Sequence, residues 1–483
     1  MKRLLAALLG LAVAVTLAGC PAPRQAPVPP GLALPTRPAP GPPPTLDGRS
    51  NPVADPVYPA YGNPAIDVLR YQLDLAWDPA GRQLSGTATL TVRPVRPLTE
   101  ITLDFASGYT VDSATVDGAA VTASRAPTGD VLVRLAHETA AESRLTVAVA
   151  YHGRPAPVAF PGNRADVDDL GMHVTADGAL WTMQEPYGAF TWYPCSDQPS
   201  DEALYDFAVT VPDGFAAVAN GTPAAPADAG GGRHTYRWHA PEPIATYLVT
   251  LAVDRFQRFD DVGPDGLPIT YWLRAAQVDD MLPVLRQTPA MLRWLSARLG
   301  RYPFSSAGVV IVAGESGMET QTMITIGPIG RSSAPVLLHE LAHHWFGDAV
   351  TPTTWRDVWL NEGFATYLQM MYTVDALGGD QKSLLAGWRT ADTVSRIEAG
   401  PPGHARADRF AARNVYLGPA LMLHEIRGQL GDAAFLAMLH DWVQHHLHTQ
   451  QTRASFTSWL TAYTGKDLTA LLDRWLDSTT TPP

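Results

Sequence analysis

The chain has 483 residues, of which 46% are hydrophobic and 17% charged. This composition excludes a disordered protein and is sufficient for two or three domains with a large core. The formal net charge is −12 and no basic run interrupts the acidic balance, which argues against nucleic acid as a partner.

The first twenty residues have the pattern of an export signal. Two basic residues precede an apolar run from Leu4 to Val15, which is too short to span a bilayer comfortably, and Leu17-Ala18-Gly19-Cys20 closes the segment. This pattern is typical of a bacterial lipoprotein signal peptide over residues 1–20, with lipid on Cys20 and an extracytoplasmic, membrane-anchored mature chain. The alternative is an ordinary secretory signal with an incidental cysteine. Cys195 would then remain alone, so no intramolecular disulfide is expected.

Residues 21–55 are predicted to form a tether. Eleven prolines lie between Pro21 and Pro44, and almost no apolar periodicity accompanies them. A stretch of this kind cannot build a core and favours extended polyproline II structure.

The segment over residues 56–258 is predicted to be a β domain. From about Tyr58 to Asp254 apolar and polar residues alternate, as in Leu84–Val92 and Leu145–Tyr151, and Gly, Pro and Asp separate the runs. Period-two alternation indicates strands with one buried face, so we expect an antiparallel sandwich or saddle.

Residues 259–483 are predicted to be mostly helical, which makes the whole chain an α+β protein. A strand over Pro268–Leu273, a helix over Met281–Leu299 and a strand over Gly308–Ala313 open this region. Two apolar stripes at helical spacing follow near its end, and both are expected to be core. They are Phe435, Leu439, Trp442 and Val443, then Leu468, Leu471, Leu472, Trp475 and Leu476.

The pentapeptide His339-Glu340-Leu341-Ala342-His343 carries the chemistry of this region. Residues four apart share one side of a helix, so His339 and His343 can bind one metal ion. Glu340 lies beside them and can accept a proton from water. The pattern therefore indicates a zinc-dependent hydrolase. The alternative is a buried helix whose histidines are satisfied and whose glutamate is salt-bridged.

Local signals place this motif on a helix and suggest its third ligand. Ser332 and Ser333 can cap the start, Pro335 suits the first turn and Gly347 can end the helix. A helix predicted over Trp355–Met371 would carry Glu362. Two histidines, one carboxylate and an open fourth position are typical of a catalytic zinc site. The group His440, His445, His446 and His448 is expected to be solvent-exposed, and no ligand role is expected for His344.

Three segments resemble the M1 family of zinc aminopeptidases, which share a thermolysin-like catalytic domain. His339-Glu-Leu-Ala-His-His-Trp-Phe-Gly347, with Glu362 inside Trp359-Leu-Asn-Glu-Gly-Phe-Ala365, resembles the family's extended zinc signature. Ser316-Gly-Met-Glu-Thr320 resembles its exopeptidase motif, usually Gly-x-Met-Glu-Asn. Tyr193-Pro-Cys-Ser-Asp-Gln-Pro199 resembles its segment facing the active site. The likeness runs from about residue 60 to the end.

The resemblance implies roles for individual residues. One zinc ion per chain would be bound by His339, His343 and Glu362, with Glu340 as general base and Tyr416 stabilising the oxyanion. The substrate's free α-amino group would be held by Glu319 and Glu185, and Gly317 and Met318 would line the substrate. The chain would thus be a metallo-aminopeptidase that removes single residues from peptides, and it is expected to be a monomer.

This sequence departs from the family pattern at several positions. Ser316 and Thr320 replace a glycine and an asparagine, and Gly418-Pro419 stand where lysine and glycine usually follow the tyrosine. The large helical carboxy-terminal domain of longer members is not expected. Glu315 would share a strand face with Glu319 and could favour a basic first residue.

Three other functions are alternatives to the aminopeptidase. They are a thermolysin-like endopeptidase, an inactive surface binding module and, within the family, a combined peptidase and epoxide hydrolase. Intact ligands and base argue against the inactive module. The absence of an extra domain from the sequence argues against the bifunctional enzyme.

Overall fold

The computed structural model describes residues 46–162, 164, 166–328 and 333–483. The predicted signal peptide and the first part of the predicted tether lie outside these residues. Residues 46–55, predicted to continue the tether, instead pack on the folded body. Ser50 Oγ donates a hydrogen bond to the Glu202 carbonyl at 3.0 Å, and the Asp55 carboxylate accepts one from the Trp355 backbone at 2.7 Å. The tether prediction is wrong for this segment because its polar side chains bind backbone groups of the body.

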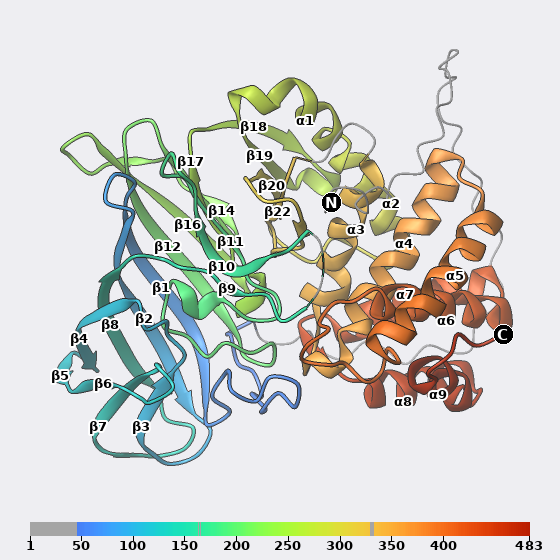
Figure 1. Cartoon of the computed structure of the whole chain (residues 1–483), viewed down its shortest axis with the longest axis horizontal. Coiled ribbons are helices and arrows are strands. Elements are labelled where there is room, and N and C mark those ends of the chain that lie inside the picture. The colour runs from blue at the N-terminus through green and yellow to red at the C-terminus, as the bar shows by residue number, and fades with distance from the viewer. Residues whose placement is uncertain (1–45, 163, 165, 329–332) are drawn as a thin grey trace. The chain divides into compact units, whose positions relative to one another are not determined.

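Three sheets form the amino-terminal β domain (Figure 1). The largest has the order β14-β16-β12-β1-β2-β8-β4-β5, with β15 beside β16. Its strands are β1 (Ile66–Asp78), β2 (Gln83–Pro94), β4 (Tyr109–Val116), β5 (Ala119–Val121), β8 (Leu145–Gly153), β12 (Glu202–Pro212), β14 (Thr222–Pro223), β15 (Ala227–Asp228) and β16 (Arg233–Ala245). The smaller sheets are β13-β17-β11-β10-β9 and β3-β7-β6. Their strands are β3 (Leu98–Leu103), β6 (Ala123–Arg125), β7 (Val131–Thr139), β9 (Val158–Ala159), β10 (Asp169–Val174), β11 (Leu180–Met183), β13 (Ala216–Ala219) and β17 (Leu251–Asp254).

The period-two prediction for this domain is confirmed. In β2, Leu84, Ala88, Leu90 and Val92 are fully buried, and the residues between them are partly exposed. One pairing departs from the antiparallel prediction, because β1 and β12 run parallel. Parallel neighbours need a long connection, and the many strands between β1 and β12 supply it.

The predicted catalytic region opens with a separate sheet of order β18-β19-β20-β22-β21. Its strands are β18 (Phe256–Val262), β19 (Pro268–Arg274), β20 (Ala307–Ile311), β21 (Gly317–Met318) and β22 (Ile324–Ile326). The predicted boundary after residue 258 falls inside β18, which pairs with β19. The predicted helix over 281–299 is two helices, α1 (Val278–Leu285) and α2 (Thr288–Leu299). Pro289 in the first turn of α2 has no N–H to donate, so the helix begins anew there.

Helices make up most of the rest of the chain (Figure 1). They are α3 (Ala334–His343), α4 (Trp359–Leu377), α5 (Gln381–Ala399), α6 (Asn414–Leu430), α7 (Asp432–His446), α8 (Arg453–Thr464) and α9 (Thr469–Asp477), with the strand pair β23 (Val350–Pro352) and β24 (Thr449–Gln451). The two predicted apolar stripes lie on α7 and on α9 with the residue before it, and both are buried. Among the described residues, no helix is long and apolar enough to cross a membrane.

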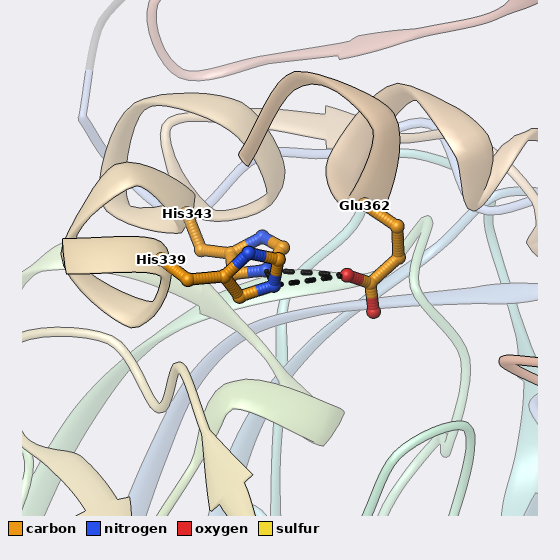
Figure 2. A group of neighbouring side chains, drawn as sticks. All are labelled: His339, His343 and Glu362. Atoms are coloured by element: carbon orange, nitrogen blue, oxygen red, sulfur yellow. Dashed lines mark hydrogen bonds and ion pairs between the residues drawn. The ribbon is translucent and has the colours of Figure 1, made fainter. Parts of the chain in front are cut away.

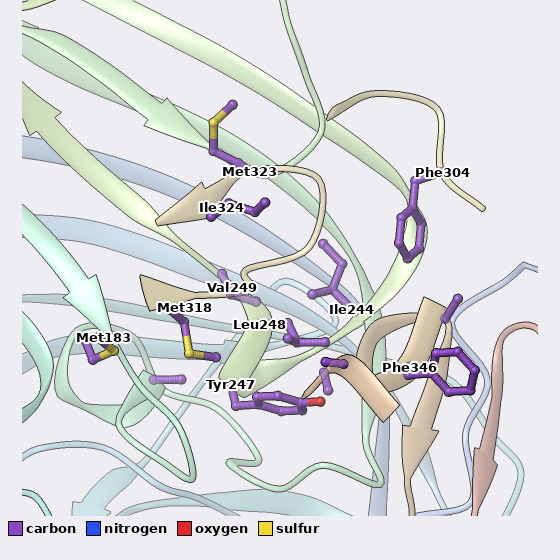
Figure 3. Packing of buried hydrophobic residues seen from close by; sticks show 14 of the residues in the cluster. Met183, Ile244, Tyr247, Leu248, Val249, Phe304, Met318, Met323, Ile324 and Phe346 are labelled. Atoms are coloured by element: carbon purple, nitrogen blue, oxygen red, sulfur yellow. The ribbon is translucent and has the colours of Figure 1, made fainter. Parts of the chain in front are cut away.

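A continuous apolar core joins the β domain to the sheet that contains β18 to β22. Figure 3 shows Met183, Tyr247 and Leu248 close to Met318 and Ile324, and each of these side chains is at most 6% exposed. Burial of this kind stabilises by roughly 25 cal/mol per Å² of apolar surface. This shared core holds the loop after β11 against the strand β21, and both segments carry predicted site residues.

Candidate active site

The helix α3 carries the zinc-signature motif and ends in an irregular turn. Ser333 occupies the position before the helix, but its side chain makes no capping hydrogen bond, and Ser332 lies outside the described residues. After His343 the chain makes one wide turn over 344–348, in which Gly347 has a φ of 134°. Glycine adopts this conformation without steric cost, so the turn is made where the sequence predicted the helix to end.

This turn orients the second histidine of the motif. The Phe346 carbonyl lies 3.1 Å from His343 Nδ1, a distance at which Nδ1–H donates to it. Nε2 of His343 is then left with a free lone pair. A metal-binding imidazole needs this arrangement, because the hydrogen bond at one nitrogen sets the tautomer at the other.

The three predicted ligands converge from α3 and α4 (Figure 2). The Nε2 atoms of His339 and His343 are 3.0 Å apart, and they lie 3.3 and 3.4 Å from Glu362 Oε2. A tetrahedral zinc ion with bonds of about 2.0–2.1 Å separates its ligand atoms by ~3.4 Å. The donor set and its spacing therefore fit one zinc ion. The helix predicted from Trp355 has only a short 3₁₀ turn at Trp355–Asp357, and α4 begins at Trp359.

Electrostatics favour an ionised carboxylate among these ligands. Burial alone would raise the pKa of Glu362, but hydrogen bonds from His339 and His343 hold it well below its usual range. Burial would lower the pKa of His343, while the charges of Glu319 and Glu362 raise it well above its ordinary value. A cation between these groups would satisfy the same negative charge.

Glu340 lies next to the three ligands. Its side chain is 7% exposed, and its carboxylate shares a cluster with Glu319 and His343 in which all ligand atoms are within 4.8 Å of one another. Burial, then the charge of Glu319, raises the pKa of Glu340 to about 8. Gly317 is close: a Cβ there would lie 2.4 Å from Glu340 Oε1. The missing side chain leaves room for the carboxylate of Glu340.

Two further carboxylates are buried at this site. Glu319 follows β21 and is 4% exposed, and Glu185 follows β11 and is 8% exposed. Among the described residues, Oε1 of each has no hydrogen-bond partner. Burial raises the pKa of both carboxyl groups, and the nearby negative charge of Glu362 raises each pKa further. A buried carboxylate oxygen that accepts no hydrogen bond is costly, so an incoming cationic donor would be bound favourably.

Tyr416 comes to the same centre from α6. Its ring stacks on the His339 ring with centroids 6.1 Å apart and an interplanar angle of 17°. Burial, then the nearby charge of Glu362, raises its pKa well above the ordinary value, so the hydroxyl keeps its proton. The predicted oxyanion donor is therefore brought next to the metal ligands, 54 positions beyond Glu362 in the sequence.

One charged residue of this site has no signal in the sequence pattern. Arg164 lies in the segment between β9 and β10, and its Nη1 donates a hydrogen bond to the Tyr416 hydroxyl at 3.1 Å. Its Nη2 donates to Ser316 Oγ at 2.9 Å. The serine that departs from the family motif thus binds an arginine. The contact joins residues that are far apart in the sequence, so only the three-dimensional structure reveals it.

The departure at Thr320 also has a structural explanation. Its hydroxyl is fully buried and donates to the Met323 carbonyl, and it lies 2.9 Å from Thr325 Oγ1. These contacts hold the turn that connects Glu319 to β22. Met318, two residues earlier, is 2% exposed within the core, so its side chain packs rather than lining an open surface.

Two predictions about other residues are wrong. The strand expected to align Glu315 with Glu319 has only two residues, and Glu315 is exposed, so the shared strand face does not exist. The four histidines near the end of α7 are half-buried rather than exposed. The ring of His446 lies 3.9 Å from that of Trp442, and burial lowers the pKa of His448 to about 4. His344 is fully buried, and its Nδ1 lies 2.9 Å from the Tyr302 hydroxyl.

Comparison with known proteins is consistent with this geometry. A family model described as the peptidase family M1 domain matches residues 316–475, and one described as the peptidase M1 N-terminal domain matches residues 68–248. Human aminopeptidase RNPEPL1 is 27% identical over 433 residues, which cover 78% of this chain and 55% of that protein. The chain spans 36% to 55% of the lengths of the first curated relatives it matches.

Solved structures match over nearly their full length. The crystal structure of a two-domain M1 zinc metallopeptidase mutant bound to L-arginine has a TM-score of 0.80 and 29% identity, covering 89% of this chain and 99% of that chain. A mutant enzyme from Deinococcus radiodurans bound to a Tyr-Ser-Ala substrate has a TM-score of 0.78 and 29% identity, with the same coverage. The predicted order of a β domain followed by a helical zinc-peptidase domain is confirmed. With both domains matched and the metal ligands assembled, the chain belongs to peptidase family M1.

Proposed function

We propose that this protein is a zinc-dependent aminopeptidase that removes single residues from the amino termini of peptides. One observation carries the proposal: the convergent ligands His339, His343 and Glu362 lie beside the buried carboxylates of Glu319 and Glu185, each of which has one oxygen that accepts no hydrogen bond from the described residues. The first group would hold a metal. The second group has the charge and the free acceptors that a substrate's α-ammonium needs.

The residues divide the chemistry among themselves. A zinc ion on the three ligands would polarise the scissile carbonyl and lower the pKa of bound water to about 7. Glu340 takes a proton from the attacking water and passes it to the leaving amine. The Tyr416 hydroxyl donates a hydrogen bond to the carbonyl oxygen as negative charge develops on it. Gly317 and Met318 form the edge strand β21, along which the substrate would bind.

Specificity for the amino terminus follows from the two acidic residues. A peptide bond inside a chain has no ammonium nearby, so its binding would leave Glu319 and Glu185 buried without a cationic group from the substrate. Desolvated unpaired charges cost several kcal/mol, so the site discriminates against internal bonds. The similar Deinococcus radiodurans enzyme, solved with a Tyr-Ser-Ala substrate, supports a peptide as ligand.

A panel of free and blocked substrates tests the proposal. Purified protein would be analysed for zinc and then assayed with amino-acid anilides, short peptides and the same peptides acetylated at the amino terminus. We expect one zinc per chain, hydrolysis of free-amine substrates and at least about 100-fold slower cleavage of acetylated ones. Equal cleavage of both would identify a thermolysin-like endopeptidase. Stoichiometric zinc without turnover of any peptide would identify an inactive binding module.

We also propose that a lipid on Cys20 anchors the chain as a monomer to the extracytoplasmic side of a bacterial membrane. The support is the basic, apolar and Leu-Ala-Gly-Cys pattern of residues 1–20, which lie outside the described structure. Expression of the full chain with radiolabelled palmitate tests this. We expect label in the wild type and none in Cys20→Ser, which should appear in the soluble fraction. Label in neither chain would reject the lipid anchor.

A further inference from the structure

Arg164 is held in a closed network of hydrogen bonds at the edge of the site. Its Nε and Nη2 lie 3.2 and 2.6 Å from the two carboxylate oxygens of Asp166. Nη2 also donates to Ser316 Oγ at 2.9 Å, and Ser316 Oγ donates to Asp166 Oδ2 at 2.8 Å. The Ser316 hydroxyl therefore accepts a hydrogen bond from Arg164 and donates one to Asp166. With two anchors, the guanidinium has its remaining nitrogen, Nη1, aimed at Tyr416.

The contact with Tyr416 has a defined direction. Arginine has five N–H donors and no acceptor, so Nη1 must donate and the phenol oxygen must accept. A phenol O–H prefers the plane of its ring and therefore has two orientations. The orientation toward Arg164 would bring two hydrogens together, so the hydroxyl proton takes the other one. The Tyr416 ring lies nearly parallel to that of His339, with their centroids 6.1 Å apart.

We infer that Arg164 is a positioning residue that commits the Tyr416 hydroxyl proton to the substrate's developing oxyanion. The inference rests on the proposed function, because it assigns the donor role to Tyr416. Nη1 also brings a positive charge to the phenol oxygen. A hydrogen bond polarised in this way strengthens the next bond that the hydroxyl donates. Asp166 and Ser316 act indirectly, because their hydrogen bonds fix the orientation of the Arg164 guanidinium.

A double-mutant cycle separates this role from a structural cross-link. Arg164→Met, Tyr416→Phe and the double variant would be assayed for kcat and KM on a leucine anilide, together with zinc content and melting temperature. Because a charged hydrogen bond is lost, we expect R164M to lower kcat by roughly 10- to 100-fold with little change in KM or zinc. In the Y416F background the same substitution should change kcat by less than about 3-fold.

Matched variants complete the experiment. Arg406 pairs with Asp408 through the same atoms, at 3.0 and 2.9 Å, on an exposed segment, so Arg406→Met should leave kcat unchanged. Ser316→Ala removes one anchor while the guanidinium stays, so it should cause a smaller loss that also vanishes in Y416F. This second cycle decides the question if R164M does not fold. Arg164→Lys should recover activity only in part, because an ammonium cannot reach all three partners.

The outcomes are distinct. A loss of kcat from R164M that is equally large with and without the tyrosine hydroxyl would overturn the inference and leave the aminopeptidase intact. A fully active Y416F would remove the donor role of Tyr416 and the inference with it. A wild-type protein that hydrolyses no free-amine peptide would instead reject the proposed function.

Discussion

Replacement of Glu319 by glutamine tests the link between buried charge and exopeptidase action. Glutamine keeps the shape and the acceptor oxygen of the side chain but removes its charge. Glu319 is 4% exposed, so little solvent screens the loss of its charge, and its Oε1 accepts no hydrogen bond from the described residues, although it lies 3.8 Å from His343 Nδ1. Truncating one partner of a buried charge pair costs about 2–5 kcal/mol, which is roughly 30- to 5000-fold in kcat/KM. Since Glu185 remains, we expect about 100-fold.

The assay compares kcat/KM for leucine anilide in wild type, Glu319→Gln and the control Glu315→Gln, with zinc measured in each. Glu315 is an exposed glutamate in the same segment, so its variant should match the wild type and keep the same ratio of arginine to leucine anilide. Zinc content should be equal in all three. Activity of E319Q within about 3-fold of wild type would refute the reasoning, as would a loss that is explained by missing zinc.

Three other outcomes are expected. Glu340→Gln should keep its zinc but lower kcat by roughly 10²- to 10⁴-fold in the anilide assay, because the proton acceptor is gone; near-normal turnover would reject the general-base role. Arg396→Met should lower the free energy of unfolding by about 3–5 kcal/mol in chemical denaturation, because it removes the counter-charge of the fully buried Asp392; a loss below about 1 kcal/mol would contradict this. Burial and the charge of Asp197 raise the pKa of Asp104 from 3.8 to about 8, so the folded state holds a proton that the unfolded chain releases. Stability should therefore fall as pH rises from about 4 to about 8, and Asp104→Asn should flatten that slope; an unchanged slope in the variant would show that other groups cause it.

The catalytic motif could be predicted from the sequence because its geometry is local. A helix repeats every 3.6 residues, so His339 and His343 must share a face wherever that helix packs. The strand pattern of β2 and the apolar stripes of α7 and α9 were equally readable, since one buried face is set by the residues of that element alone. The resemblance to a known family then supplied Glu319, Glu185 and Tyr416.

Contacts between distant segments could not be read in this way. Nothing in the spacing of Arg164, Ser316 and Tyr416 says that their side chains meet, and the glutamates at 185 and 319 converge only because the loop after β11 packs on β21. The parallel pairing of β1 with β12 and the packing of residues 46–55 are likewise products of the assembled fold. Periodicity fixes which face of an element is buried, while the neighbour on that face is chosen by the shape and polarity of the whole core.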